Sequence, residues 1–220
     1  IPGTAQDVRA YFLTLQYWLA GSEDNLARMV NFLVHRYAAG PREVLRKVAR
    51  EEPPIEYPDV GVYQLEGRHR IVDSVEAMTT QAGETSGTVG LLLMRSYALA
   101  GNTRHYDAVI RAFEARGLRV IPAFAAGLDA RPAVKRFFMD GKTPIVDAVV
   151  SLTGFSLVGG PAYNDTDAAQ EILSELNVPY LAVQALEFQS INQWRESPMG
   201  LMPVEATIMV AIPELDGAIG

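Results

Sequence analysis

Three side chains in the second half of the chain have the chemistry of a proton acceptor. Glu205 and Glu214 stand on either side of an apolar run, and a carboxylate beside an apolar strand can have a raised pKa and act as a base. His105 stands in the first turn of a predicted helix, where a neutral imidazole can accept a proton or bind a metal. The plainer interpretation is that the two acids are turn or cap residues and that His105 lies on a helix surface.

A glycine-rich loop, residues 153–161, follows an apolar run and has the glycine spacing of a phosphate-binding loop. Such a loop requires a lysine that reaches the outer phosphates and a serine or threonine for magnesium. Gly160 and Pro161 stand in those two places, so the loop is not expected to bind a nucleotide. Its glycines predict close backbone approach or unusual dihedral angles, or simply a tight loop.

The overall composition excludes several classes of protein. The chain has 220 residues and a formal net charge of −7, which argues against a nucleic-acid surface. It contains no cysteine, which excludes disulfides, thiolate zinc sites and cysteine nucleophiles. No run reaches the roughly 18 apolar residues of a membrane helix, so a transmembrane protein is not expected. The chain begins with Ile1, and we expect it to be an internal piece of a longer polypeptide.

Helices are predicted for residues 1–52, a segment that we assign to a neighbouring domain of the parent protein. Ser22 is a suitable cap for the second helix, and Pro41 suits the first turn of a short third one. In the first helix, apolar residues recur at helical spacing and share one face. That face is formed by Val8, Tyr11, Phe12, Leu15 and Trp18.

The pattern changes within a connector, residues 53–87, where we place the domain boundary and one short strand at residues 71–72. Beyond it, apolar runs alternate with helical segments, which is typical of a parallel sheet covered on both faces. The predicted strands are residues 89–94, 118–122, 145–150, 178–183 and 207–212. Because crossovers are right-handed, the simplest topology is doubly wound. The predicted fold is α/β, a doubly wound, mostly parallel, flavodoxin-like sheet over residues 88–217, preceded by an N-terminal helical segment.

Ligands of doubly wound sheets bind beyond the carboxyl ends of the strands. The loops predicted at that edge carry the apolar residues Tyr97, Phe124, Leu128, Phe155, Leu157, Tyr163, Leu186 and Phe188. This rim predicts a site for a large flat hydrophobic ligand. The competing interpretation is that the rim packs against parts of a parent protein outside this chain. Glu205 and Glu214 flank the last predicted strand, roughly 20 Å apart if it is regular, and are not expected to bind one metal.

Four runs of sequence carry a resemblance to a known family. They are residues 100–107, 117–124, 151–162 and 203–217. Together, and in this order, they resemble the large porphyrin-binding subunits of magnesium chelatase and cobalt chelatase, with magnesium chelatase the closer of the two. Residues 1–60 are similar to the helical segment that precedes these runs in the family. Because the family's subunits are much longer than this chain, the resemblance implies an internal fragment that is inactive when isolated.

The resemblance implies a role in inserting Mg²⁺ into protoporphyrin IX, a step toward chlorophyll or bacteriochlorophyll. Both Mg²⁺ and the porphyrin are then substrates. ATP is bound and hydrolysed by two partner ATPase subunits and not by this chain, which agrees with the missing phosphate loop. The implied location is the cytoplasm, or the plastid stroma if the parent protein comes from a plant or alga.

Metal insertion requires a base, because the two pyrrole protons leave as the metal enters. His105, Glu205 and Glu214 are this segment's candidates for proton removal or metal delivery. Arg104 is the candidate for a porphyrin propionate, and Phe155 and Tyr163 are candidates for contact with the ring; the metal ligands stay open. Two alternatives remain: a non-catalytic scaffold or subunit-docking module of such a chelatase, and an unrelated α/β domain that binds a small molecule.

Overall fold

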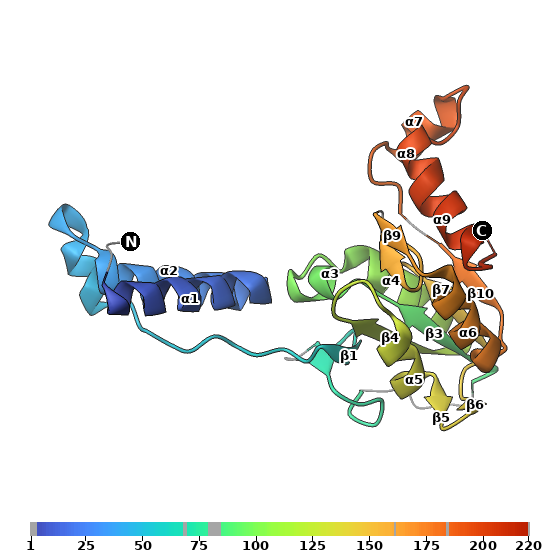
Figure 1. The fold of residues 1–220 in the computed structure, drawn as a ribbon, viewed down its shortest axis with the longest axis horizontal. Helices are drawn as coiled ribbons and strands as arrows, with labels where there is room; N and C mark the ends of the chain where they lie inside the picture. Colours follow the sequence, from blue (N-terminus) through green and yellow to red (C-terminus); the bar gives the residue numbers. More distant parts are fainter. Residues whose placement is uncertain (1–3, 68–69, 79–84, 161, 184, 220) are drawn as a thin grey trace. The chain divides into compact units, whose positions relative to one another are not determined.

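The computed structural model describes residues 4–67, 70–78, 85–160, 162–183 and 185–219 (Figure 1). His69 of the connector and Pro161 of the glycine-rich loop therefore lie outside the described residues. The chain divides into two compact units. We call Ile1–Pro58 with Ser96–Asn102 the helical unit, and Asp59–Arg95 with Thr103–Gly220 the α/β unit.

The helical unit contains the predicted N-terminal helices α1 (Ala5–Ala20), α2 (Glu23–Tyr37) and the 3₁₀ helix η1 (Gly40–Lys47). As predicted, the Ser22 side chain caps α2, accepting a hydrogen bond from the Asn25 backbone N–H. The helices pack through a small core of Ala10, Tyr17 and Phe32. The predicted apolar face of α1 lies elsewhere on the helix and is exposed, as Phe12 at 59% and Trp18 at 61% illustrate.

The central sheet of the α/β unit is built on four parallel strands that the sequence predicted. They are β3 (Gly87–Leu92), β4 (Leu118–Ala125), β7 (Ala148–Ser151) and β10 (Tyr180–Ala182). β3 is central: its Val89 pairs with Val120 of β4 on one side and with Ala148 of β7 on the other. Taken in chain order as first to fourth, the parallel strands are arranged 2-1-3-4, the flavodoxin-like arrangement.

Two antiparallel strands extend the sheet beyond β4. β1 (Val60–Tyr63) pairs with β4, and β2 (Ile71–Val72), the short strand predicted in the connector, pairs with β1. The full order in the described part of the chain is β10-β7-β3-β4-β1-β2. β1 was not predicted from the sequence, because its pairing partner lies some sixty residues further along the chain (Val60 pairs with Ala125).

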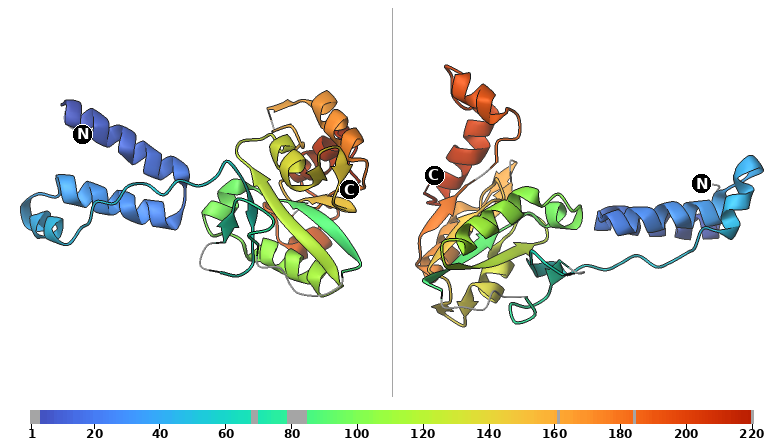
Figure 2. Two further views of the ribbon diagram at one scale, coloured as in Figure 1. Left: turned by 90° about the horizontal axis from the view of Figure 1, so that it is seen from below. Right: turned by 180° about the vertical axis from the view of Figure 1, so that it is seen from behind.

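Helices cover both faces of this sheet, as the sequence predicted. Figure 2 shows α4 (Arg104–Glu114) on one face and α5 (Arg131–Phe137) and α6 (Thr166–Leu176) on the other. Between the sheet, α5 and α6 lies the main core, which includes Ile121, Phe137, Phe138, Ile172 and Leu176. Shorter elements complete this region: the pair β5 (Met139–Asp140) and β6 (Thr143–Pro144), and the pair β8 (Gly159–Gly160) and β9 (Tyr163–Asn164). The short helix α3 (Arg95–Leu99) belongs to the helical unit except for Arg95.

The fifth predicted strand, residues 207–212, is wrong: this segment is helical. It belongs to a continuous helical run formed by α8 (Pro203–Ala206), the π-helical turn η2 (Thr207–Ala211) and α9 (Ile212–Leu215), which follows α7 (Ile191–Glu196). The run begins with proline at its first position, and a short apolar run between polar residues does not by periodicity alone distinguish a strand from a helix. The nine helical steps from Glu205 to Glu214 then span about 14 Å, not 20 Å of strand.

Next to β10, where a flavodoxin-like sheet has its fifth strand, a single residue pairs with the sheet. Ile219 forms an isolated parallel bridge with Leu181 of β10. The Ile219 N–H donates to Tyr180 O at 2.9 Å, and its carbonyl accepts from the Ala182 N–H at 3.0 Å. The C-terminal helical run is therefore attached to the sheet at its far end.

Candidate functional site

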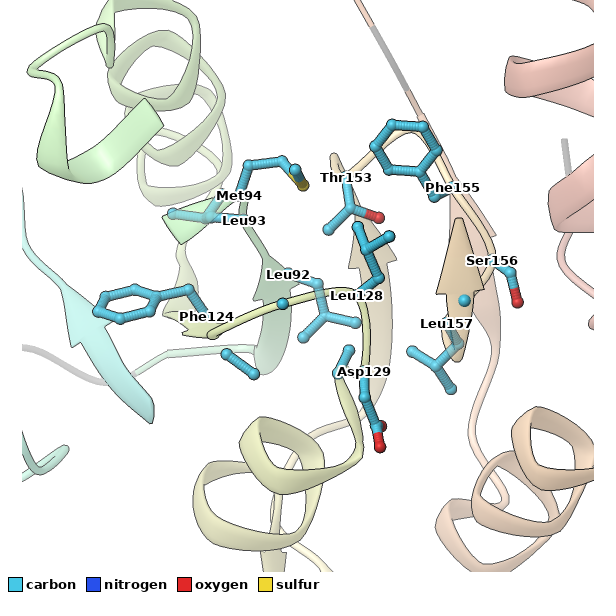
Figure 3. Close-up of a pocket in the computed structure, with 14 residues that line it drawn as sticks. Leu92, Leu93, Met94, Phe124, Leu128, Asp129, Thr153, Phe155, Ser156 and Leu157 are labelled. Carbon is cyan, nitrogen blue, oxygen red and sulfur yellow. The ribbon is translucent and has the colours of Figure 1, made fainter. Parts of the chain in front are cut away.

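The strand order places a topological switch point between β3 and β7. From β3 the chain moves to β4 on one side, and from β4 it returns past β3 to β7 on the other. Ligands of open α/β sheets bind outside the carboxyl ends of the strands at such a point. The loops that leave β3, β4 and β7 there surround a hollow of about 360 Å³ that opens to solvent (Figure 3). This hollow is the candidate site.

The wall of the hollow is mainly apolar. Its lining includes Leu92 at the end of β3 and Met94 after it, Phe124 near the end of β4 and Leu128 after that strand, and Phe155 and Leu157 after β7. The space enclosed in the hollow is only about 30 Å³, enough for about one or two water molecules, and the rest of its volume is open to solvent. The hollow is therefore a shallow recess, which can contact one apolar edge or substituent of a large ring but cannot enclose it.

The polar side chains at the hollow already have partners. Asp129 forms an ion pair with Arg131 at 2.7 Å, and the hydrogen bond from that guanidinium holds the pKa of the Asp129 carboxyl below its usual range. The Thr153 hydroxyl lies 2.9 Å from that of Ser151. A ligand in the hollow would thus meet apolar carbon and a single carboxylate that is already neutralised.

Gly159 of the loop after β7 meets both predicted reasons for a glycine, an unusual dihedral angle and close backbone approach. Gly159 has φ +128°, and a Cβ added to it would lie 2.2 Å from the backbone oxygen of Tyr163. The Gly159 N–H donates to Leu128 O at 2.6 Å, and Leu157 O accepts from the Ala130 N–H at 2.9 Å. These bonds join the loops after β4 and β7, so two walls of the hollow form one connected unit.

Of the six predicted site residues, Phe155 lies in the lining of the hollow, and the lining does not include the other five. His105 lies in the first turn of α4, with its ring 4.0 Å from that of Tyr106. Burial lowers the pKa of His105, so at neutral pH its imidazole is uncharged and able to accept a proton. Its neighbour Arg104 is exposed at the start of the same helix.

The two predicted glutamates differ in their surroundings. Glu205 is 2% exposed, and its carboxylate accepts hydrogen bonds from the backbone N–H groups of Phe188, at 3.1 Å, and Met202, at 3.3 Å. Glu214 is exposed on α9, and Tyr163 is exposed on β9. The assignment of roles to these residues stays a prediction, with Glu205 already engaged by the backbone through both oxygens.

One buried acid at the site was not predicted from the sequence. Asp216, at the end of α9, is 2% exposed and accepts hydrogen bonds from Ser156 and Leu157 of the loop after β7. From the sequence it was one of two acids after the apolar run 207–212, each a possible base or a turn residue, and only Glu214 was named as a site residue. The signal that would have identified it, contact with residues some sixty positions earlier, is not contained in local sequence.

Sequence comparison places the chain in a known family. The model of the family described as CobN/Magnesium Chelatase matches residues 15–220, and the chain therefore belongs to this family. The chain is 55% identical over 218 residues to the H subunit of magnesium chelatase from Cereibacter sphaeroides, covering 99% of this chain and 18% of that protein. It is 38% identical to the chloroplastic magnesium-chelatase subunit ChlH of rice, over 97% of this chain and 16% of the relative.

A solved structure agrees with the fold. The catalytic subunit of cobaltochelatase from Mycobacterium tuberculosis superposes with a TM-score of 0.64 at 28% identity, covering 96% of this chain and 16% of that one. The chain thus spans less than a fifth of the length of these relatives. Within the described residues no helix is long and apolar enough to cross a bilayer. No cluster of three or more potential metal-ligating side chains occurs in the same part of the chain.

Proposed function

We propose that this chain is a segment of the porphyrin-binding subunit of magnesium chelatase, which inserts Mg²⁺ into protoporphyrin IX. The observation that carries the proposal is the 55% identity with the H subunit of a magnesium chelatase over 218 residues. The hollow at the switch point supports it, because its apolar lining suits contact with one edge of a tetrapyrrole. The remainder of the ring would contact parts of the full-length subunit outside this chain.

In this proposal the chain's residues bind the ring and move protons. Phe155, with Leu128 and Leu157, contacts the apolar edge, and the exposed guanidinium of Arg104 pairs with a propionate. As the metal enters, the two pyrrole nitrogens each lose a proton. His105 is the preferred acceptor of one proton, because its lowered pKa keeps the imidazole neutral, and the second proton passes to solvent water. Glu214 is exposed and able to deliver the hydrated metal, which prefers oxygen ligands. Glu205 would have to release its backbone partners before acting as a base.

The proposed partners are two ATPase-type chelatase subunits, which bind and hydrolyse the ATP. The loop after β7 supports this division, because it has no lysine where a phosphate loop requires one. The proposed location is the cytoplasm, or the plastid stroma in a plant or alga.

The test uses the full-length subunit and a matched pair of phenylalanine variants. Phe155→Ala removes apolar contact from the hollow, and we expect the porphyrin Kd, measured by fluorescence quenching, to rise about tenfold, equivalent to about 1.4 kcal/mol. Phe12→Ala removes the same group from the exposed face of α1 in the helical unit and should leave the Kd unchanged. An unchanged Kd for Phe155→Ala would show that the hollow is not part of the porphyrin-binding site.

The proposed base is tested by magnesium insertion in the presence of both ATPase subunits. We expect His105→Ala to lower kcat more than tenfold with little change in porphyrin Kd, since proton transfer contributes to the transition state and not to ring binding. Normal turnover by His105→Ala would remove it from the reaction. If single variants of Phe155, His105 and Glu214 all insert magnesium at the normal rate, the chain is better described as a scaffold without a catalytic residue.

A further inference from the structure

Asp216 is a buried acid at the junction of α9 and the loop after β7. Its side chain is 2% exposed, and within the described residues it forms no ion pair. Removing a carboxylate from water is unfavourable unless hydrogen bonds replace the lost hydration. Here the replacement comes from the loop after β7: Leu157 N–H donates to Oδ2 at 2.6 Å and the Ser156 hydroxyl to Oδ1 at 2.9 Å. The carboxylate therefore orients two successive residues of that loop.

The hydrogen bonds continue into the loop itself. Ser156 Oγ, while donating to Asp216, accepts from the Val158 N–H at 3.2 Å. Asp216 thus fixes residues 156–158, of which Leu157 lines the hollow and Ser156 directly follows Phe155. Through the bond from Ala130 N–H to Leu157 O, the same network reaches the loop after β4. A change at Asp216 would reach the apolar wall without touching a ligand.

Asp216 is itself held on a firm support. It caps the end of α9, and three residues later Ile219 is hydrogen-bonded on both sides to the edge strand β10. The carboxylate is therefore fixed between the sheet edge and the C-terminal helical run that carries Glu205 and Glu214. From this position Asp216 can keep the loop after β7 in a fixed position relative to the C-terminal helical run.

We propose that Asp216 is a positioning residue, which orients Ser156 and Leu157 so that Phe155 presents its ring to the porphyrin edge. The inference rests on the proposed function of the hollow. It predicts that Asp216 acts on the substrate through Phe155 and not by direct contact. The contribution of Asp216 to affinity should therefore disappear once Phe155 has been removed.

A double-mutant cycle in the full-length subunit tests this coupling. Asp216→Asn replaces one acceptor oxygen by a donor that faces the Leu157 N–H or the Ser156 hydroxyl, and we expect the porphyrin Kd to rise five- to tenfold. In the Phe155→Ala background the same change should raise the Kd less than twofold, because coupled residues are not additive. Asp167→Asn makes the same chemical change at an exposed position of α6 and should leave the Kd unchanged.

The outcomes separate the two proposals. If Phe155→Ala leaves the Kd unchanged, the hollow's function fails. If Phe155→Ala weakens binding but Asp216→Asn does not, or if the two effects simply add, the positioning role alone is overturned. Where Asp216→Asn does not fold, Ser156→Ala removes one donor and keeps Leu157 in place. It should raise the Kd two- to threefold, again only when Phe155 is present, and additive behaviour there contradicts the proposal equally.

Discussion

The predicted apolar face of α1 and the core of the α/β unit both consist of apolar residues, but the first is exposed and the second is buried. Phe12 on α1 is 59% exposed, whereas Phe138, behind the central sheet, is fully buried. The helical unit places Ala10, Tyr17 and Phe32 in its buried core, while the main core of the α/β unit combines buried side chains from several strands and from α5 and α6. Apolar periodicity thus predicts which residues share a face, but not whether anything within the same chain covers that face.

The largest expected effect comes from a matched truncation in the two regions. Phe138→Ala empties a packed position and should lower the free energy of unfolding by about 3–5 kcal/mol. Phe12→Ala should change it by less than about 0.5 kcal/mol, because an exposed ring loses little on truncation. Urea unfolding of both variants, followed by circular dichroism, measures the difference. An equal loss of unfolding free energy in both variants would contradict this difference between the two regions and indicate that α1 is covered in solution.

Glycine-to-alanine substitutions compare the backbone of the same two regions. Gly159→Ala places a methyl group against the Tyr163 backbone at a φ that side chains rarely adopt, and should cost about 3 kcal/mol or more. Gly40 in the helical unit also has positive φ, but no atom would lie within 4 Å of a methyl group added there, so Gly40→Ala should cost about 1 kcal/mol. Thermal unfolding of the two variants provides the measurement, and similar costs would show that crowding at Gly159 is unimportant.

The smallest of the three effects concerns a buried hydroxyl. Tyr63 of β1 donates to Asp107 at 2.6 Å, and burial raises its pKa to about 12. Because the folded pKa lies above the unfolded value of 10.0, this tyrosine contributes stability that is complete below pH 10 and is lost as the pH rises toward 12. Tyr63→Phe should cost about 1–2 kcal/mol at neutral pH and reduce the alkaline loss.

The matched control for this measurement is Tyr11→Phe, since Tyr11 is 51% exposed. Its unfolding free energy should stay within about 0.5 kcal/mol of the parent chain across the same pH range. A titration followed by phenolate absorbance, compared between the parent chain and Tyr63→Phe, identifies the ionisation of Tyr63. Ionisation of Tyr63 near pH 10 would contradict the effect of burial.

Local sequence was sufficient to predict the parallel strands of the core. It was insufficient where contacts with distant residues determine the secondary structure. The run from Val89 to Met94 is apolar throughout, as a central strand covered on both faces requires, and β3 lies there. Residues 207–212 have a similar composition, but they follow Pro203 and a glutamate that accepts from the Met202 N–H, and they are helical. An apolar run of six residues fits either structure, and only its surroundings decide between them.

The site divides in the same way. Phe155 could be predicted, because it follows a strand that ends at the ligand edge of a doubly wound sheet. Asp216 could not, because its partners Ser156 and Leu157 are about sixty residues away and its burial depends on the C-terminal helical run. The roles of His105, Glu205 and Glu214 stay predictions, because none of the three side chains lies in the lining of the hollow.

The single bridge made by Ile219 has a consequence for solubility. An open β10 would present unpaired N–H and C=O groups, on which a foreign strand can assemble. By occupying Tyr180 O and the Ala182 N–H, Ile219 closes that margin, while β2 at the opposite margin is only two residues long. A chain truncated before Ile219 should therefore aggregate through its exposed sheet edge even if every core contact survives.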